Sequence, residues 1–189
     1  MKNILITLLL LLVITANLCA QDYNNVRLLE FEIGMGINQG SKYMGFQAER
    51  GYHILMETRL NIRETPFSVG LQTSFATYFI NNVYNYDFHI MPRMTILYVD
   101  YNYRKWEKIS LFGGIGLGHA QVINRYESND PNYWDRDSIY DYFYSLSPRI
   151  GAEFFHRLRL TIDYKIISKD YSYLGTHLGL VLGGGQRKK

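Results

Sequence analysis

Apolar and polar residues alternate along much of the chain. Between Leu29 and Ile37 the odd-numbered positions carry bulky apolar side chains, whereas Glu30, Glu32 and two glycines occupy the even positions. Successive side chains of a strand point to opposite sides, so a period of two places the apolar residues on one face. This stretch therefore predicts a long strand with one apolar and one polar face.

The same alternation recurs along the chain, and no segment after residue 20 shows a helical period. It predicts an all-β fold of eight strands, each about ten residues long. Within the fourth strand Pro92 cannot donate a ladder hydrogen bond, so we expect a bulge or local break there. The predicted strands are residues 27–37, 53–63, 67–80, 88–101, 109–121, 143–155, 158–167 and 174–183.

The connections between these strands alternate in length. Short turns at one end and long loops at the other are typical of an antiparallel, up-and-down outer-membrane β-barrel, and strands of this length suit a tilted crossing of the bilayer. A soluble sandwich or a secreted lipocalin-like barrel also alternates. However, an eight-stranded interior has little room for eight faces of Leu, Ile and Phe, so we expect these faces to meet lipid. The short connections are 64–66, 102–108 and 156–157, and the long ones are 38–52, 81–87, 121–142 and 168–173.

The first twenty residues differ from the rest. Lys2 precedes an apolar run and the small residue Ala20, a pattern typical of a cleaved secretory signal peptide. We expect residues 1–20 to be removed and residues 21–189 to form the barrel domain. An acylated Cys19 is the alternative, which the bulky Leu18 disfavours. Cys19 is the only cysteine, and 20 Lys and Arg stand against 17 Asp and Glu, so neither disulfides nor a nucleic-acid partner is expected.

Three stretches carry a family resemblance: "LSPRIGAEF", which leads into "RLRLTIDYKI", and the closing "HLGLVLGGG". Together with the signal peptide and the eight segments, they resemble the small Gram-negative outer-membrane barrels of the OmpA-transmembrane-like, porin-family type. The resemblance covers nearly the whole mature chain. It implies a location in the outer membrane, with outer-membrane lipid, lipopolysaccharide and the barrel-assembly machinery as partners, and it implies no cofactor.

Charged residues of both signs fall on the predicted lumen face of several strands. Unpaired charges in a closed interior are costly, so we expect them to pair across strands, with Glu32 next to Arg59 and Glu153 next to Lys165 as candidates. Such a polar network would fill the barrel and leave no wide aqueous pore. Its predicted members are Glu30, Glu32, Glu57, Arg59, Arg93, Arg149, Glu153, Asp163 and Lys165.

The glycine-rich stretch "FGGIGLGHA", residues 112–120, does not fit a nucleotide-binding loop. His119 occupies the position of the third glycine of a dinucleotide motif, and no helical pattern follows. Gly114, Gly116 and Gly118 share one parity, which predicts a stripe on the lumen wall that leaves room for larger side chains such as Arg93 or Arg149. Gly113 falls on the lipid side.

The five histidines show neither an H-x-H pair nor an H-E-x-x-H spacing, so no metal site is predicted. His53, His89 and His177 are expected in the lumen, His119 near the start of the long third loop, and His156 in a short turn. A lipid A deacylase or acyltransferase-like barrel remains the alternative function. Its His–Ser dyad is missing, because no serine follows His119 two residues on.

The long third connection holds Tyr133, Trp134, Asp135 and Asp137, and these are the candidates for contact with a ligand or partner. Connecting loops frequently carry function on a rigid scaffold. The sequence therefore predicts a non-catalytic barrel with a structural, adhesive or partner-binding role through its surface loops. It does not identify the external partner.

Overall fold

The computed structural model describes residues 27–43, 46–83, 86–103, 108–128 and 136–183. The predicted signal peptide and the basic C-terminal end lie outside these ranges. Among the described residues, no helix is long and apolar enough to cross a membrane.

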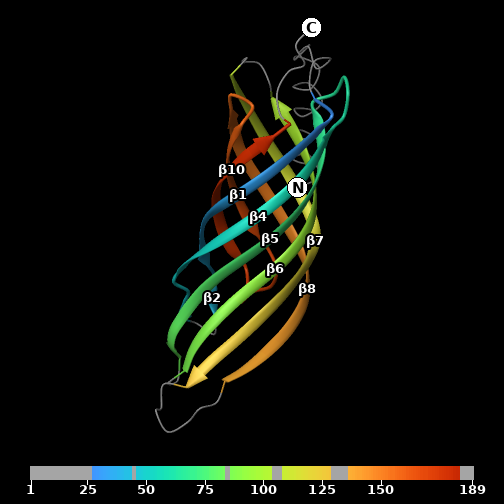
Figure 1. Cartoon of the computed structure of the whole chain (residues 1–189). Coiled ribbons are helices and arrows are strands. Elements are labelled where there is room, and N and C mark those ends of the chain that lie inside the picture. Colours follow the sequence, from blue (N-terminus) through green and yellow to red (C-terminus); the bar gives the residue numbers. More distant parts are fainter. Residues whose placement is uncertain (1–26, 44–45, 84–85, 104–107, 129–135, 184–189) are drawn as a thin grey trace, which may run out of the picture.

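Eight antiparallel strands form one closed barrel (Figure 1). The barrel closes where β1, the first strand of the chain, pairs with β10, the last. The predicted all-β, up-and-down fold is thereby confirmed. A separate two-stranded hairpin, β2 (Lys42–Tyr43) and β3 (Phe46–Gln47), follows the first strand. The barrel strands are β1 (Leu29–Gly40), β4 (Arg50–Asn61), β5 (Phe67–Val83), β6 (Tyr86–Tyr103), β7 (Ile109–Ser128), β8 (Arg136–Phe154), β9 (Leu158–Lys165) and β10 (Tyr173–Leu182).

The middle strands are longer than their sequence pattern predicts. β7 has 20 residues and β8 has 19, so most of the predicted loop 121–142 is strand, and β5 and β6 take up most of 81–87. Cross-strand pairing continues after the apolar alternation ends, because the ladder needs only backbone groups. β9, by contrast, has 8 residues. Figure 1 shows β5–β8 continuing past the other strands at the end away from the short turns.

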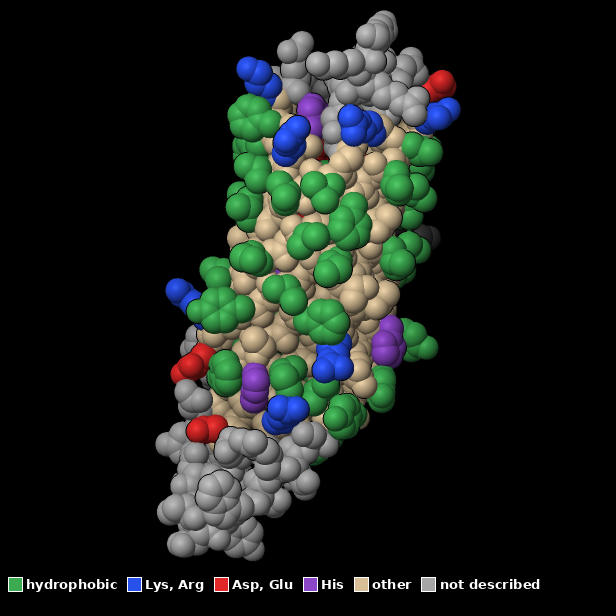
Figure 2. Space-filling model, in the orientation of Figure 1, with side chains coloured by type: hydrophobic (Ala, Val, Ile, Leu, Met, Phe, Trp, Pro, Cys, Tyr) green, Lys and Arg blue, Asp and Glu red, His purple; other side chains and the backbone are tan. Residues whose placement is uncertain are grey.

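The outer surface of the barrel is apolar and the polar faces point inward. Every second residue of β4 is buried, and the buried set includes Glu57 and Arg59, each 1% exposed. The apolar side chains face outward instead, with Met35 71% and Leu117 67% exposed. Figure 2 shows hydrophobic side chains spread over the middle of the visible face, with charged side chains toward both ends. This is the arrangement of a barrel that meets lipid and the opposite of a lipocalin-like one.

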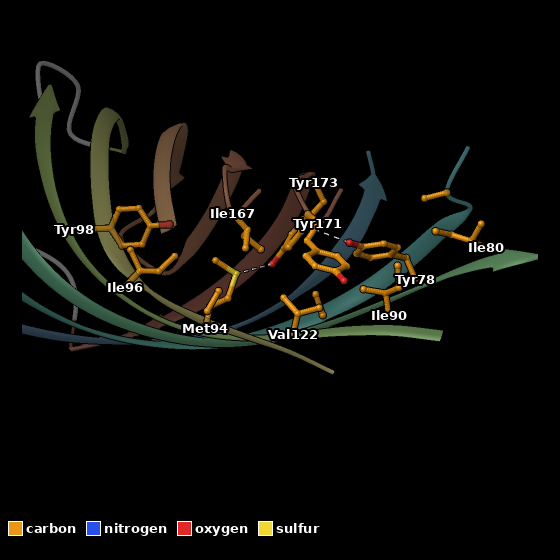
Figure 3. Packing of buried hydrophobic residues seen from close by; sticks show 13 residues of the cluster. Tyr78, Ile80, Ile90, Met94, Ile96, Tyr98, Val122, Ile167, Tyr171 and Tyr173 are labelled. Atoms are coloured by element: carbon orange, nitrogen blue, oxygen red, sulfur yellow. Dashed lines mark hydrogen bonds between the residues drawn. The ribbon is translucent and has the colours of Figure 1, made fainter. Parts of the chain in front are cut away.

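The lumen is not uniformly polar. One part of it holds a buried cluster in which Tyr78 from β5, Met94 from β6 and Tyr173 from β10 meet across the barrel (Figure 3). The Tyr78 hydroxyl donates to the Tyr171 carbonyl oxygen at 3.3 Å, and the Tyr173 hydroxyl lies 3.5 Å from the Met94 sulfur. These side chains join opposite walls of the barrel.

The prediction that Arg93 and His89, on the strand predicted at 88–101, face the lumen is wrong, because the other face of this strand lines the apolar part of the lumen. Ile90, Met94, Ile96 and Tyr98 are buried inside, whereas Arg93 faces outward. His89 faces outward too, since its ring stacks on that of Phe79 at 4.4 Å and Phe79 is exposed. The assignment was wrong because it took apolar residues as lipid-facing on every strand, and here the lumen itself is apolar.

The expected break at Pro92 is present. Pairing of β5 with β6 stops at Phe75 and Arg93 and resumes at Tyr78 and Ile90 in the same register. Proline has no N–H to donate, which accounts for the interrupted ladder.

Candidate functional site

The centre of the charged part of the lumen is Arg59, which β4 directs inward. Its Nη1 lies 2.8 Å from Glu30 Oε2, its Nη2 lies 2.8 Å from Glu32 Oε2, and its Nε lies 3.1 Å from Glu57 Oε1. The predicted pair of Glu32 and Arg59 is therefore present. Because β1 and β4 are neighbours, residues far apart in the chain meet here.

Arg149 extends the network from β8 across the lumen. It donates to both carboxylate oxygens of Glu57, at 2.5 and 2.9 Å, and to both of Asp100, at 2.9 and 2.6 Å. Its guanidinium carbon also lies 3.6 Å from the centroid of the Tyr98 ring. Two bidentate pairs and a stacked ring fix this side chain strongly.

Arg159 and Lys165 carry the network onto β9. Arg159 donates to Asp100 Oδ2 at 3.2 Å, and its guanidinium carbon lies 3.4 Å from the Phe112 ring centroid. Lys165 donates to Gln72 Oε1 at 3.0 Å and to the Tyr98 hydroxyl at 2.5 Å. It also lies 3.0 Å from Asp163 Oδ2.

The predicted pair of Glu153 with Lys165 is wrong. Glu153 Oε2 lies 3.7 Å from both Arg59 Nη1 and Arg159 Nη1, while Lys165 pairs with Asp163 two residues before it. Glu153 and Lys165 lie twelve residues apart along a β8–β9 hairpin whose register pairs Glu153 with Arg159. Side-chain pairs follow that register, which sequence parity alone does not provide.

The structure places all but one of the predicted network residues inside the barrel. The exception is Arg93, which belongs to the outer surface for the reason given above. The buried members are Glu30, Glu32, Glu57, Arg59, Arg149, Glu153, Asp163 and Lys165.

The sequence prediction missed Asp100 and Arg159, which are both buried in the network. Arg159 shares the parity of Asp163 and Lys165, so the alternation already placed it on the polar face. Asp100 lies near the end of β6, between Val99 and Tyr101. Since both neighbours are largely apolar, the alternation places this carboxylate on the lumen face, and this signal would also have corrected the parity of the strand.

The glycine stripe of β7 does face the lumen. A Cβ on Gly114 would lie 2.0 Å from Asp100 Oδ1, and one on Gly116 would lie 2.5 Å from Ile96 Cγ2. The space left by the missing side chains of these glycines is therefore occupied by Asp100, Ile96 and Tyr98 of β6, and not by Arg93. Arg149 does stand opposite Gly114 in the pairing of β7 with β8.

The histidines divide between the two faces of the wall. His53 and His177 are buried inside with their ring centroids 5.3 Å apart, as predicted, whereas His89 faces outward. His119 lies within β7 and faces outward, and His156 lies in the turn between β8 and β9. Within the described residues, no group of three or more His, Cys, Asp and Glu side chains could hold a metal ion.

The geometry separates the residues that a hydrolytic dyad would need. His119 points out of the barrel, while Ser145 and Ser147 are buried in the lumen, where Ser147 Oγ lies 2.6 Å from the Tyr98 hydroxyl. The wall lies between these groups, so His119 cannot activate either serine.

A second candidate site is the part of the sheet beyond β9. β8 pairs with β9 from Arg149 to Phe154, followed by one bridge at Leu146. Among the described residues, 136–145 pair with β7 alone and form a free edge on the other side. The side chains of Tyr140, Tyr142 and Tyr144 are 55%, 64% and 91% exposed along it.

Of the predicted loop candidates, the structure describes only Asp137. Tyr133, Trp134 and Asp135 lie outside the described residues. Asp137 lies on β8, where its backbone is paired with that of Tyr126. The sequence predicted a loop at Asp137, where the structure has the paired strands β7 and β8.

Comparison with known proteins supports the fold. No protein-family profile matches the chain, and no curated protein matches its sequence. Among solved structures, the barrel is similar to Neisserial surface protein A, with 10% identity, a TM-score of 0.53, and 84% of this chain and 98% of that chain covered. It is also similar to the attachment invasion locus protein Ail of Yersinia pestis in complex with the heparin analogue sucrose octasulfate, with 17% identity, a TM-score of 0.49, and coverage of 82% and 99%. The predicted fold, that of the small eight-stranded outer-membrane barrels, is confirmed.

Proposed function

We propose that this outer-membrane β-barrel is a non-catalytic binding protein that holds an extended segment of a partner protein on its exposed sheet edge. The observation that carries the proposal is the free edge of β8 at residues 136–145. An unpaired edge presents a row of backbone N–H and C=O groups, onto which another strand can add.

Over residues 139–144 the edge has few of the features that usually protect a strand from such pairing, although Arg136 and Asp137 precede this stretch. Natural edges are shortened, charged or interrupted by proline. Residues 139–144 contain one charged residue, Asp141, and the exposed side chains of Ile139, Tyr140, Tyr142 and Tyr144. Tyrosine adds large contact area at low entropy cost, so the side chains can add specificity to the backbone pairing.

The lumen supports a role at the surface rather than transport. The side chains of Arg149, Arg159 and Lys165 extend across the charged part of the lumen. The buried cluster that contains Tyr78, Met94 and Tyr173 extends across the apolar part. An eight-stranded barrel has an interior just wide enough for its side chains. We therefore infer that the lumen is plugged, with the barrel serving as a rigid support for the edge.

Selection of phage-displayed peptides on the refolded protein in nanodiscs tests this function. We expect extended peptides that slow amide hydrogen exchange in residues 136–145 when bound. A variant with Tyr140→Lys, Tyr142→Lys and Tyr144→Lys should lose most of this binding, since lysine protects edge strands.

The matched control replaces the same three tyrosines by phenylalanine. It keeps the rings and the free edge, so the selected peptides should still bind. Peptides that bind the lysine variant as tightly as the wild type, or that protect no amide of the edge, would contradict the proposal.

A further inference from the structure

The free edge of β8 has two different sides. Tyr140 and Tyr142 are exposed on its outer side, whereas Asp141 between them points inward, where the Tyr171 hydroxyl donates to its Oδ2 at 3.1 Å. Tyr171 belongs to the buried cluster in the apolar part of the lumen (Figure 3). A strand that adds to this edge therefore meets tyrosine on one side and a carboxylate on the other.

A chain of hydrogen bonds ends at this carboxylate. Asn124 of β7 donates from Nδ2 to the Tyr171 hydroxyl at 2.5 Å, and that hydroxyl donates to Asp141. Asn124 is 3% exposed, and its Oδ1 has no hydrogen-bond partner within the described part of the chain. Buried polar groups are nearly always satisfied, so this acceptor points to a donor that comes from outside the chain.

Asp141 also lacks a counterion. It is half-buried, and among the described residues no lysine, arginine or histidine forms an ion pair with it. The rings of Phe143 and Tyr171 lie beside it, with their centroids 5.4 Å apart. A carboxylate without a counterion, an amide oxygen without a donor and two aromatic rings together suit an ammonium or guanidinium group.

The pairing of β8 with β9 indicates how a partner strand would lie. β9 runs antiparallel to β8, and the last contact of this pairing is the bridge between Leu146 and Ile166. A segment that continues this line along residues 136–145 would also be antiparallel to β8. Directly opposite residues of an antiparallel pair point to the same face, so the partner residue opposite Asp141 would point inward. The residues before and after it would lie on the outer side, against the exposed tyrosines.

We propose that the partner segment carries a lysine or arginine opposite Asp141. Its cation binds the Asp141 carboxylate and Asn124 Oδ1, next to the Tyr171 ring, while apolar residues on either side of it pack against the tyrosines of the outer side. The inference rests on the strand-binding function proposed above and adds the charge pattern of the partner, which is a basic residue between two apolar ones.

Selection from a random phage-displayed peptide library on three forms of the protein in nanodiscs tests this charge pattern. The wild type should enrich peptides with a lysine or arginine between apolar residues, and Asp141→Lys should enrich peptides with an acidic residue at that place. Cross-strand pairs of opposite charge are stabilising and like charges are destabilising, which accounts for the reversal. A synthetic copy of an enriched peptide in which the basic residue is alanine should bind the wild type about tenfold more weakly, since hydrogen bonds to charged groups are strong. Asp141→Asn should remove most of that difference.

The third form is the matched control, Asp170→Lys, in the turn between β9 and β10. Asp170 lies at the same end of the barrel and directly precedes Tyr171, but it takes no part in the chain of hydrogen bonds. This variant should still enrich basic peptides, and unheated gel migration verifies that each variant has folded.

Equal effects of the Asp141 and Asp170 variants would show diffuse attraction and overturn the inference. Edge-binding peptides without any preference for charge would overturn it as well, while leaving the strand-binding function intact. The absence of any edge-binding peptide would contradict that function and the inference together.

Discussion

Arg149 and Arg93 carry the same charge on opposite faces of the barrel wall. Arg149 is buried between Glu57 and Asp100, whereas Arg93 faces outward. Removing one partner of a buried ion pair leaves the other charge uncompensated, so Arg149→Met should lower the free energy of unfolding by about 3–5 kcal/mol. Urea titration in detergent measures the change.

The control for this prediction is Arg93→Met, which removes a charge from the outer surface. Surface substitutions usually change the free energy of unfolding by no more than about 0.5 kcal/mol, and we expect the same here. Equal effects of the two substitutions would contradict the assigned faces of β6 and β8.

Two glycines of β7, three residues apart and on opposite faces of the wall, give a second test at this scale. A Cβ on Gly116 would lie 2.5 Å from Ile96 Cγ2, whereas one on Gly113 would lie 3.8 Å from Ile150 Cγ2. Overpacking costs about 1–3 kcal/mol, so Gly116→Leu should destabilise the barrel by at least that amount and reduce the folded fraction on unheated gels. Gly113→Ala should be mild, and equal tolerance of both substitutions would argue against the assigned faces.

At the scale of the strand, Pro92 separates two well-paired stretches of β5 and β6. Pro92→Ala supplies the missing N–H, so the ladder should run without interruption from Phe67 to Ile80. One added hydrogen bond contributes about 0.5–1.5 kcal/mol. We expect slower amide hydrogen exchange at Ala76 and Thr77 and a higher urea midpoint. Unchanged exchange at both residues would mean that another feature opens the ladder.

The strands also show what the alternation of residue types can and cannot predict. It located all eight strands because a wall between lipid and a charged lumen imposes a period of two, as on β4. It failed on β6, where Ile96 and Tyr98 face an apolar part of the lumen and the two faces differ little in polarity. It also missed the ends of β7 and β8, since strand pairing continues there through backbone groups that every residue carries.

The pairing of charges inside the barrel was only partly predictable for a related reason. Parity placed Glu32 and Arg59 on the same face of adjacent strands, and they do pair. Arg149 with Glu57 joins strands that are not neighbours in the ring. Contacts across the lumen depend on the diameter and stagger of the closed barrel, which a strand pattern does not contain.

At the scale of the whole molecule, the plugged lumen that we propose predicts that the protein does not conduct ions. The rings of Tyr78 and Tyr173 lie 6.2 Å apart, Tyr98 reaches Lys165, and Arg149 links Glu57 to Asp100. A continuous water path would have to break these contacts and expose buried charges. In planar bilayers the refolded protein should therefore give no large, stable open steps.

A variant with Tyr78→Ala, Tyr98→Ala and Tyr173→Ala provides the comparison, with unheated gel migration to verify that it has folded. It removes three of the four tyrosines of the buried cluster, and with Tyr98 the hydroxyl that accepts from Lys165, while leaving the acidic and basic residues in place. We expect this variant to show more frequent current events than the wild type, since water could then reach the charged network. Large, stable steps in the wild type would instead mean that the lumen side chains move aside together, and the barrel would then be a channel.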